Sequence, residues 1–290
     1  MLKSIFISAY LTVAMAITAY AVWMMSQGGD GVTWVGVLLT VAPIVMVIST
    51  WMMLRNTPRT SPGLRPIAML AVIGLILTFI QAQGQIAPML ATLGLIGFFI
   101  YSNWYSRFAD RSASGIVPGA PLPEFSLLDI GGNTVTSERL ADRPAILIFY
   151  RGNWCPLCMA QVKELAARYA EIKSYGVRVA LISPQPHNNT VGLANKFGVD
   201  FDFLTDTDNR VARLLGIDIE FGLPMGMQVL GYDSQTVMPT VIITGKKGQV
   251  IWLHETDNYR VRPDPDVYLK VLRDNGIVPS SDITPGAGTH

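Results

Sequence analysis

Long apolar stretches separated by short polar breaks make up the first third of the chain. Four runs without a charged residue stand out, at about Ile5–Met25, Val32–Leu54, Pro66–Ala82 and Ile86–Tyr105. At a rise of about 1.5 Å per residue, each can cross a hydrocarbon core of about 30 Å, the third only barely. The pattern therefore predicts an α-helical transmembrane bundle of four spans over residues 1–106.

Basic residues are distributed unevenly around these runs. Those in or near the short loops all fall on one side of the predicted bundle: Lys3, Arg55, Arg59, Arg65, Arg107 and Arg111. The loops on the other side contain no Lys or Arg, so the N-terminus and the domain after the bundle are expected in the cytoplasm. The expected location is an integral membrane protein, in the cell inner membrane if the source is bacterial. Cleavage of a signal peptide at Ala21 is an alternative that leaves three spans and the same orientation.

The predicted spans lack the residues that usually carry intramembrane chemistry. They contain no Cys, His, Asp, Glu, Lys or Arg, whereas ion and proton pathways depend on such ionisable groups. This favours an anchor or assembly role in contact with the lipid bilayer, including association of copies into a homo-oligomer through the spans. A role in binding a quinone or a lipid stays open.

A second pattern, of short apolar runs alternating with helical periodicity, begins after a linker at residues 107–123. It predicts a domain at residues 124–276, before a tail at residues 277–290 that is expected to be disordered. The expected elements are a hairpin at Phe125–Leu128 and Asn133–Thr136, a strand at Ala145–Tyr150, a helix at Cys155–Tyr175, a strand at Val177–Ser183, helices at Thr190–Phe197 and Asn209–Leu215, a hairpin at Thr240–Thr244 and Gln249–Leu253, and a helix at Asp264–Asp274. This order predicts an α/β thioredoxin-like domain, with a central mixed sheet flanked by helices.

Composition and charge exclude several classes of function. Half of the residues are hydrophobic, 15% are charged and the formal net charge is +1. There is no basic stripe with interleaved aromatic residues, so no nucleic-acid partner is expected. Two cysteines three positions apart exclude a structural disulfide framework.

The two cysteines, Cys155 and Cys158, form a Cys-x-x-Cys motif where the first central strand gives way to a helix. Pro156 suits the first helical position, because the N–H that it lacks would have no partner there. The helix dipole and free N–H groups favour a thiolate at Cys155, and such cysteines have pKa values of about 3.5–7.5. Arg151 would add a positive field if its side chain turns inward. Cys155 is therefore expected to attack and Cys158 to resolve.

Metal binding is a poor alternative for this motif. A zinc site needs two further ligands, and the only histidines are His187, His254 and His290. No metal and no cofactor are expected.

The second half of the chain resembles a known family. Residues from about 117 to 274 resemble the redoxin branch of the alkyl hydroperoxide reductase and thiol-specific antioxidant family, the peroxiredoxin-like proteins. The segments that carry the resemblance are Phe149–Cys158, Leu181–Gln185, Leu204–Asp206, Pro239-Thr240 and Asp257–Pro263. The resemblance implies that Pro239 is cis and faces the dithiol, and that either Arg260 or Arg262 approaches Cys155.

The sequence differs from both peroxiredoxins and thioredoxin at positions that matter for their chemistry. Peroxiredoxins carry Thr or Ser three residues before the reactive Cys and Pro seven before, where this chain has Gly152 and Ile148. Thioredoxin carries a buried Asp six residues before its first Cys, where this chain has Phe149. Trp154 and the Cys-x-x-Cys spacing favour thioredoxin chemistry.

The leading hypothesis is therefore a membrane-anchored thiol-disulfide oxidoreductase that acts on protein disulfides through the dithiol. The alternative is a thiol-dependent peroxidase that reduces hydroperoxides through Cys155, with Cys158 resolving. Both need a cellular thiol reductant or an equivalent redox partner. A third hypothesis is a membrane assembly protein whose domain only docks partners.

Overall fold

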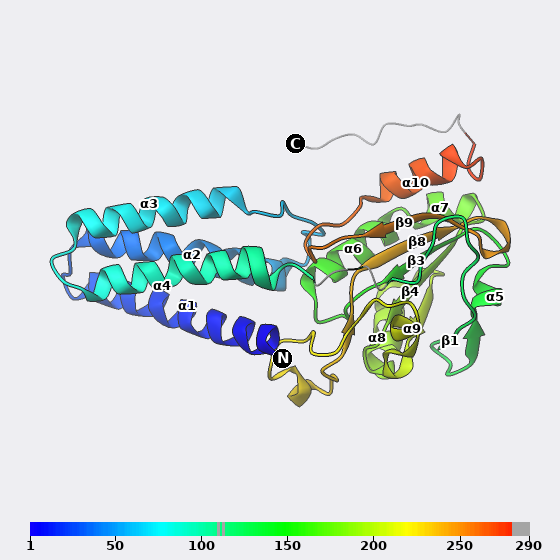
Figure 1. The fold of residues 1–290 in the computed structure, drawn as a ribbon, viewed down its shortest axis with the longest axis horizontal. Coiled ribbons are helices and arrows are strands. Elements are labelled where there is room, and N and C mark those ends of the chain that lie inside the picture. Colours follow the sequence, from blue (N-terminus) through cyan, green and yellow to red (C-terminus); the bar gives the residue numbers. More distant parts are fainter. Residues whose placement is uncertain (109–110, 112–113, 280–290) are drawn as a thin grey trace.

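The computed structural model, which describes residues 1–108, 111 and 114–279, shows a helical bundle joined end to end with an α/β domain (Figure 1). The bundle consists of α1 (Leu2–Ser26), α2 (Gly31–Leu54), α3 (Arg65–Gln81) and α4 (Ile86–Ile100), and α4 continues into a π-helical turn, η1 (Tyr101–Tyr105). The start of α1, the loop between α2 and α3, and the end of α4 all lie at the domain end of the bundle (Figure 1).

The four predicted apolar helices form, but only three of them meet the length expected of a membrane span. By length and composition the candidates are Leu2–Ser26, Gly31–Leu54 and Ile86–Tyr105. Helix α3 has 17 residues, a length of about 25 Å against a hydrocarbon core of about 30 Å. The prediction of four spans is therefore wrong for the third, because its helix begins at Arg65 and stops at Gln81.

Close backbone contact holds α3 in the bundle despite its length. A Cβ added to Gly36 of α2 would lie 2.7 Å from the Gly74 carbonyl oxygen of α3, and one added to Gly74 would lie 2.4 Å from the Gly36 oxygen. Small residues at such crossings let two apolar helices pack closely without a hydrophobic driving force from water.

The α/β domain is built on one seven-stranded mixed sheet. The strand order is β2-β1-β5-β4-β3-β8-β9, and the parallel pairs are β3–β4 and β4–β5. The strands are β1 (Ser126–Leu128), β2 (Thr134–Thr136), β3 (Ala145–Phe149), β4 (Arg178–Ser183), β5 (Asp202–Thr205), β8 (Thr240–Thr244) and β9 (Val250–Glu255). A separate two-stranded sheet pairs β6 (Asp218–Ile219) with β7 (Thr236–Val237).

Helices cover both faces of the main sheet. The helices of the domain are α5 (Ser137–Leu140), α6 (Pro156–Ala167), α7 (Tyr169–Ser174), α8 (His187–Phe197), α9 (Arg210–Leu214) and α10 (Pro265–Asp274), with single 3-10 turns at η2 (Thr207–Asn209), η3 (Met227–Leu230) and η4 (Lys246–Gly248). Side chains of β3 alternate between two cores. Ile146 and Ile148 pack with α6 and α10, while Leu147 and Phe149 pack with α5 and α9. This is the predicted thioredoxin-like arrangement.

Two details of the domain differ from the sequence-based expectations, and a third expectation is mostly untested. The long helix expected after Cys155 breaks at Arg168, whose φ of −100° and ψ of 10° separate α6 from α7. Strand β5 was not expected, because four residues between turns carry little periodic signal. Residues 280–290 of the expected disordered tail lie outside the described residues, and Val278 just before them is buried.

The bundle and the domain share one continuous hydrophobic core. At the junction, the hydroxyl oxygens of Tyr101 and Tyr259 lie 2.8 Å apart, and the Thr60 N–H donates to the Arg260 carbonyl oxygen at 3.0 Å. The Met225 N–H donates to the Ser4 carbonyl oxygen at 3.1 Å. The bundle therefore packs directly against the domain surface that carries the predicted site.

Candidate active site

The dithiol lies at the junction between β3 and α6. Cys155 occupies the position before the first helical residue, with φ of −83° and ψ of 111°, and Pro156 begins the helix. Cys158 follows one turn later on α6. Both thiols are free and buried, at 1% and 0% exposure. The structure thus places both cysteines at the helix N-terminus, as the motif predicts.

The turn before Cys155 is fixed by a residue that the sequence reasoning did not assign to the site. The Gln185 Oε1 atom accepts a hydrogen bond of 2.7 Å from the Asn153 N–H, and its Nε2 atom donates to the Tyr150 hydroxyl at 3.1 Å. Gln185 ends one of the segments that carry the family resemblance, and that was the only sequence signal for it.

Gly152 explains why the peroxiredoxin hydroxyl is absent at this position. Its φ of +135° is a conformation that only glycine adopts readily, and a Cβ there would lie 2.8 Å from the indole of Trp154. The Trp154 Nε1–H donates to the Arg151 carbonyl oxygen at 3.1 Å, which keeps the ring in place. The indole thus occupies the space that a Thr or Ser side chain would need.

Arg262 is the arginine that reaches the sulfur atoms. Its Nη2 atom lies 3.3 Å from the Cys158 Sγ atom and 3.9 Å from the Cys155 Sγ atom. Its Nη1 atom donates to the Gln161 Oε1 atom at 2.7 Å. The guanidinium is buried, so its charge acts on the thiols with little screening by water.

Arg260, the other candidate, points away from the dithiol. It is fully buried and donates to the carbonyl oxygens of Ser61 and Pro62 in the loop between α2 and α3. Its guanidinium also lies 5.5 Å from the ring centre of Tyr101. Arg260 therefore joins the domain to the bundle, and of the two predicted arginines only Arg262 contacts sulfur.

Arg151 turns inward beside the motif. Its guanidinium lies 4.7 Å from the ring centre of Trp154 and 5.2 Å from that of Tyr259, and it donates to the Gly222 carbonyl oxygen. Its positive charge lowers the pKa of both thiols. A second buried cation therefore faces the dithiol.

Pro239 differs from the expectation drawn from the resemblance. No cis peptide bond occurs among the residues that the structure describes, so the bond before Pro239 is trans and the prediction of a cis proline is wrong. Its carbonyl oxygen accepts a hydrogen bond of 3.1 Å from the Nη2 atom of Arg111, which follows the bundle. That contact ties the carbonyl to the segment after the bundle and so constrains the backbone there.

The two thiols differ in acidity. Burial raises the pKa of Cys155, and so does the hydrogen bond that it donates to Cys158. Burial acts in the same direction on Cys158, but the hydrogen bond from Cys155, the charge of Arg262 and a backbone hydrogen bond from Arg151 lower its pKa to about 5. These contacts favour ionisation of Cys158 over ionisation of Cys155. The motif predicts the thiolate at Cys155, whereas the Nη2 atom of Arg262 lies nearer to the Sγ atom of Cys158, at 3.3 Å against 3.9 Å.

A cavity of about 460 Å³ opens onto Cys155 but not onto Cys158. Residues of the domain that line it include Trp154, Pro156 and Tyr259. Its other wall comes from the bundle: Ile7, Leu11, Ile48, Trp51, Tyr101 and Tyr105. Of the two thiols, the described lining of the cavity includes that of Cys155, so the cavity reaches the dithiol at Cys155, across largely apolar and aromatic surface.

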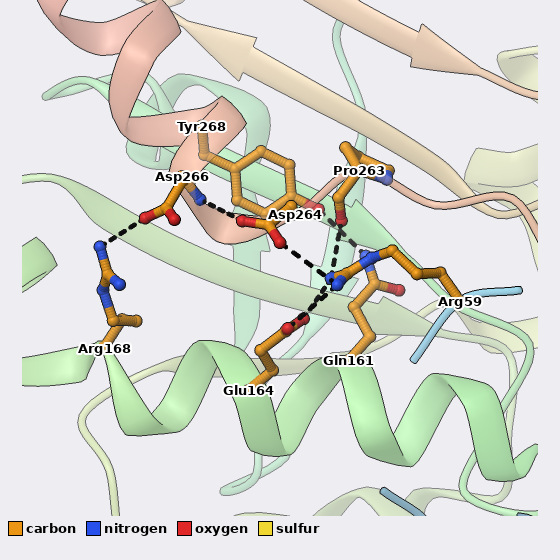
Figure 2. A network of polar contacts seen from close by, with 8 residues as sticks. All are labelled: Arg59, Gln161, Glu164, Arg168, Pro263, Asp264, Asp266 and Tyr268. Carbon is orange, nitrogen blue, oxygen red and sulfur yellow. Dashed lines mark hydrogen bonds and ion pairs between the residues drawn. The ribbon is translucent and has the colours of Figure 1, made fainter. Parts of the chain in front are cut away.

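A polar network on the far side of α6 links the bundle loop to the segment that carries Arg262 (Figure 2). Arg59 of the loop donates to the Pro263 carbonyl oxygen and forms ion pairs with Glu164 of α6 and Asp264. On α6, the Gln161 Nε2 atom donates to the Tyr268 hydroxyl at 3.0 Å (Figure 2). Gln161 therefore connects Arg262 with α10. Neither Gln161 nor Arg59 was predicted as a site residue, because their partners lie about a hundred or more positions away in the sequence.

Among the residues that the structure describes, no group of three or more His, Cys, Asp or Glu side chains is arranged to hold a metal ion. The chemistry that the site offers is that of two sulfur atoms beside two buried guanidinium groups.

Comparisons with known proteins show what the domain is similar to. Residues 118–253 match the model of a family described as the AhpC/TSA family. The chloroplastic peroxiredoxin Q of Triticum aestivum is 29% identical over 129 residues, which cover 44% of this chain and 58% of that protein. The chloroplastic peroxiredoxin Q of Gentiana triflora is 29% identical over 135 residues, which cover 46% of this chain and 60% of that protein. The chain thus spans about three fifths of the length of these relatives.

A solved structure is also similar to this chain. The crystal structure of the peroxidoxin BcpB from Mycobacterium tuberculosis aligns with a TM-score of 0.46 and 20% identity, and it covers 54% of this chain and 96% of that one. Residues 118–253 are thus similar to the AhpC/TSA family, and the family match and the relatives confirm the resemblance predicted from the sequence.

Proposed function

We propose that this protein is a membrane-attached, thiol-dependent peroxidase in which Cys155 reduces the hydroperoxide and Cys158 resolves the oxidised sulfur. The observation that carries the proposal is the division between the two thiols. Cys155 borders the cavity, whereas Cys158 lies behind it with a pKa of about 5, against the guanidinium of Arg262.

The hydrogen bond between the thiols supports a mechanism in which one proton moves first from Cys155 to Cys158 and then from Cys158 to the leaving oxygen. Transfer of the proton from Cys155 to Cys158 leaves a thiolate on Cys155, which attacks the distal oxygen of ROOH. The O–O bond breaks, Cys155 becomes a sulfenic acid, and the alkoxide RO⁻ takes the proton from Cys158 to leave as ROH. The Cys158 thiolate then attacks the Cys155 sulfur, which forms the disulfide and expels hydroxide.

The two arginines supply the electrostatic support for the first step. Negative charge moves from sulfur to the leaving oxygen in the transition state, and fixed cations stabilise such charge in a site without water. Arg262 lies 3.9 Å from the Cys155 Sγ atom, and Arg151 lies over the rings that line the cavity. They take the place of the hydroxyl that the Trp154 ring excludes at Gly152.

Exchange with a protein disulfide, the leading hypothesis from the sequence, is the second candidate. The Cys-x-x-Cys spacing at a helix N-terminus favours it. Burial of both sulfur atoms counts against it, because an incoming protein disulfide must reach the Cys155 Sγ atom in line with its own S–S bond. The match to the AhpC/TSA family also favours peroxide over protein disulfides as the substrate.

Either reaction leaves a disulfide, so turnover requires a cellular thiol reductant. Stopped-flow oxidation of the reduced full-length protein tests the function. We expect rapid loss of thiols with hydroperoxides and slow loss with an oxidised protein disulfide. The reverse ranking would establish thiol-disulfide exchange instead.

The three candidate spans support attachment to a membrane. We infer that the domain faces the cytoplasm, and that the membrane is the inner membrane if the source is bacterial. Contacts between the bundle and the domain support placing the N-terminus, the loop between α2 and α3 and the domain on the same side of the membrane. Lys3 donates to the Arg107 carbonyl oxygen, and the Thr60 N–H donates to the Arg260 carbonyl oxygen. Single cysteines introduced near Arg59 and at the C-terminus, in a Cys155→Ser/Cys158→Ser background, should resist impermeant thiol reagents added to intact cells. Labelling from outside would reverse the orientation. Association of copies through the bundle remains part of the proposal, and crosslinking in the membrane tests it.

A further inference from the structure

The cavity beside Cys155 continues from the dithiol to the surface of the apolar bundle. Ile7 and Leu11 of α1 and Ile48 of α2 line one part of it, while Cys155 lies at another. Its volume of about 460 Å³ falls within the range of about 300–1,000 Å³ that small-molecule pockets occupy. Hydrogen peroxide needs no such space and gains nothing from an apolar wall. The cavity is therefore built for a substrate with an apolar body.

An exposed apolar loop lies at the same junction. In residues 221–230, Val229 is 89% exposed and Leu230 is 68% exposed, although apolar side chains of this size are usually buried. The loop lies beside the start of α1 (Figure 1), where the Ser8 hydroxyl donates to the Met225 carbonyl oxygen at 2.9 Å. Leu230 also lines the cavity. A loop of this kind, placed against a candidate span, is suited to contact with the bilayer surface.

Arg55, at the end of α2, has no anionic partner among the described residues, although its charge acts on the nearby Tyr232. Arg55 lines the cavity and follows the last residue of a candidate span, Leu54. Its side chain makes no hydrogen bond or ion pair with any residue that the structure describes, whereas Arg59 in the same loop has several. Basic residues at this depth reach the lipid head groups. Arg55 thus offers a positive charge to an anion that the protein itself does not supply.

We propose that the cavity takes the acyl chain of a lipid hydroperoxide from the bilayer, with Arg55 binding the anionic head group of that lipid and the peroxide group reaching Cys155. This inference deepens the proposed peroxidase function and rests on it. The reaction is the one given above with R as the acyl chain, so the product is the corresponding hydroxy lipid. The head group is a carboxylate or a phosphate, since either can pair with a guanidinium.

The test uses the full-length protein in phosphatidylcholine vesicles with three peroxides: linoleic acid hydroperoxide, its methyl ester, and hydrogen peroxide. We expect kcat/KM to be at least about tenfold higher for the fatty acid hydroperoxide than for hydrogen peroxide, because burial of the chain adds binding energy. Arg55→Gln should lower kcat/KM for the free acid about fivefold, the size of one partly exposed charged contact. It should leave the methyl ester and hydrogen peroxide unchanged.

Two further variants serve as controls for the cavity. Arg65→Gln removes an exposed arginine of the same segment that does not line the cavity, and it should have no effect. Ile48→Trp should fill part of the cavity and reduce turnover of both acyl peroxides more than that of hydrogen peroxide, because the small peroxide needs less of the space. A comparison of a phosphatidylglycerol hydroperoxide with the fatty acid hydroperoxide, each in vesicles, distinguishes a phosphate from a carboxylate head group. The substrate whose kcat/KM falls more in Arg55→Gln carries the head group that Arg55 binds.

Binding gives a readout that does not depend on turnover, because Trp51 and Trp154 both line the cavity. The hydroxy fatty acid should quench their fluorescence, and Arg55→Gln should weaken that binding. Two outcomes would overturn this inference and leave the proposed peroxidase function standing. One is normal turnover of hydrogen peroxide without any preference for acyl peroxides. The other is an equal effect of Arg55→Gln on all three peroxides. Absence of turnover with every peroxide would refute the proposed function and this substrate with it.

Discussion

Gln161 and Arg262 form a hydrogen bond of 2.7 Å between the Oε1 and Nη1 atoms, and Gln161 lies on the helix that begins at the dithiol. The helix that holds both sulfur atoms therefore also orients the cation that acts on them. Gln161 is 4% exposed, and its amide nitrogen donates to the Tyr268 hydroxyl of α10. The amide thus holds the Nη1 atom of the guanidinium, while its Nη2 atom contacts sulfur.

Removal of Gln161 should weaken the effect of Arg262 without removing the charge. In Gln161→Ala we expect the pKa of Cys158 to rise above about 5 and kcat/KM for hydroperoxide to fall about tenfold, since a hydrogen bond to a charged group is lost. Thiolate absorbance as a function of pH measures the first effect. Gln83→Ala changes an exposed glutamine at the far end of the bundle and should alter neither quantity. An unchanged pKa of Cys158 in Gln161→Ala would show that packing alone orients Arg262.

Loss of Arg262 itself should be more severe. Arg262→Met is expected to reduce kcat/KM about a hundredfold, the usual cost of a lost charge-stabilising group, and to raise the pKa of Cys158. Arg262→Lys should recover only part of the activity, because one ammonium cannot contact two sulfur atoms and the Gln161 amide in the fixed geometry of a guanidinium. Arg210→Met, at an exposed arginine, is the matched control. Full activity of Arg262→Met would show that Arg151, and not Arg262, stabilises the charge in the transition state.

The two cysteines should give different products with hydroperoxide. Cys158→Ser should stop at a sulfenic acid on Cys155, which dimedone traps and mass spectrometry identifies, because no thiol remains to resolve it. Cys155→Ser should consume no peroxide, since Cys158 does not line the cavity. A dimedone adduct on Cys158 in Cys155→Ser would mean that the thiol of lower pKa is also the one that peroxide reaches.

The stability of the reduced protein should depend on pH through the two thiols. From about pH 5 to the pKa of an unfolded thiol, about 8.5, the unfolded chain holds a proton on Cys158 that the folded chain lacks. Stability therefore rises with pH across this window and is lost as pH falls through 5. Above this window stability falls with pH. The raised pKa of Cys155 keeps a proton on the folded chain, whereas the unfolded chain has released it.

Thermal unfolding in detergent measures this dependence. The Tm of the reduced protein minus that of the Cys155→Ser/Cys158→Ser variant should increase from pH 5 to about pH 8 and decrease above about pH 9. A flat difference across the range would exclude a thiolate in the folded, reduced site.

The sequence by itself determined the change from an apolar helical region to an α/β domain, the order of the longer strands and helices, and the position of the dithiol. Each of these follows from local information. Apolar runs free of charge indicate lipid-facing or buried helices, and a Cys-x-x-Cys motif with Pro156 after its first cysteine marks a helix N-terminus. The segment Phe149–Cys158 was specific enough to indicate the family that the comparisons then supported.

Only the tertiary structure decided which groups act on the sulfur atoms. Arg260 and Arg262 are equivalent in the sequence, but one bonds to Pro62 of the bundle loop and the other lies 3.3 Å from Cys158. Ionisation of Cys158 is favoured because the hydrogen bond from Cys155 and the charge of Arg262 lower its pKa, although burial raises the pKa of both thiols. The cavity also depends on the tertiary fold, since its walls come from residues as distant as Ile7 and Tyr259. The acidity of the thiols and the access of a substrate to them depend on charges and surfaces that are close in space. These groups are far apart in the sequence, so no local sequence pattern predicts their contact.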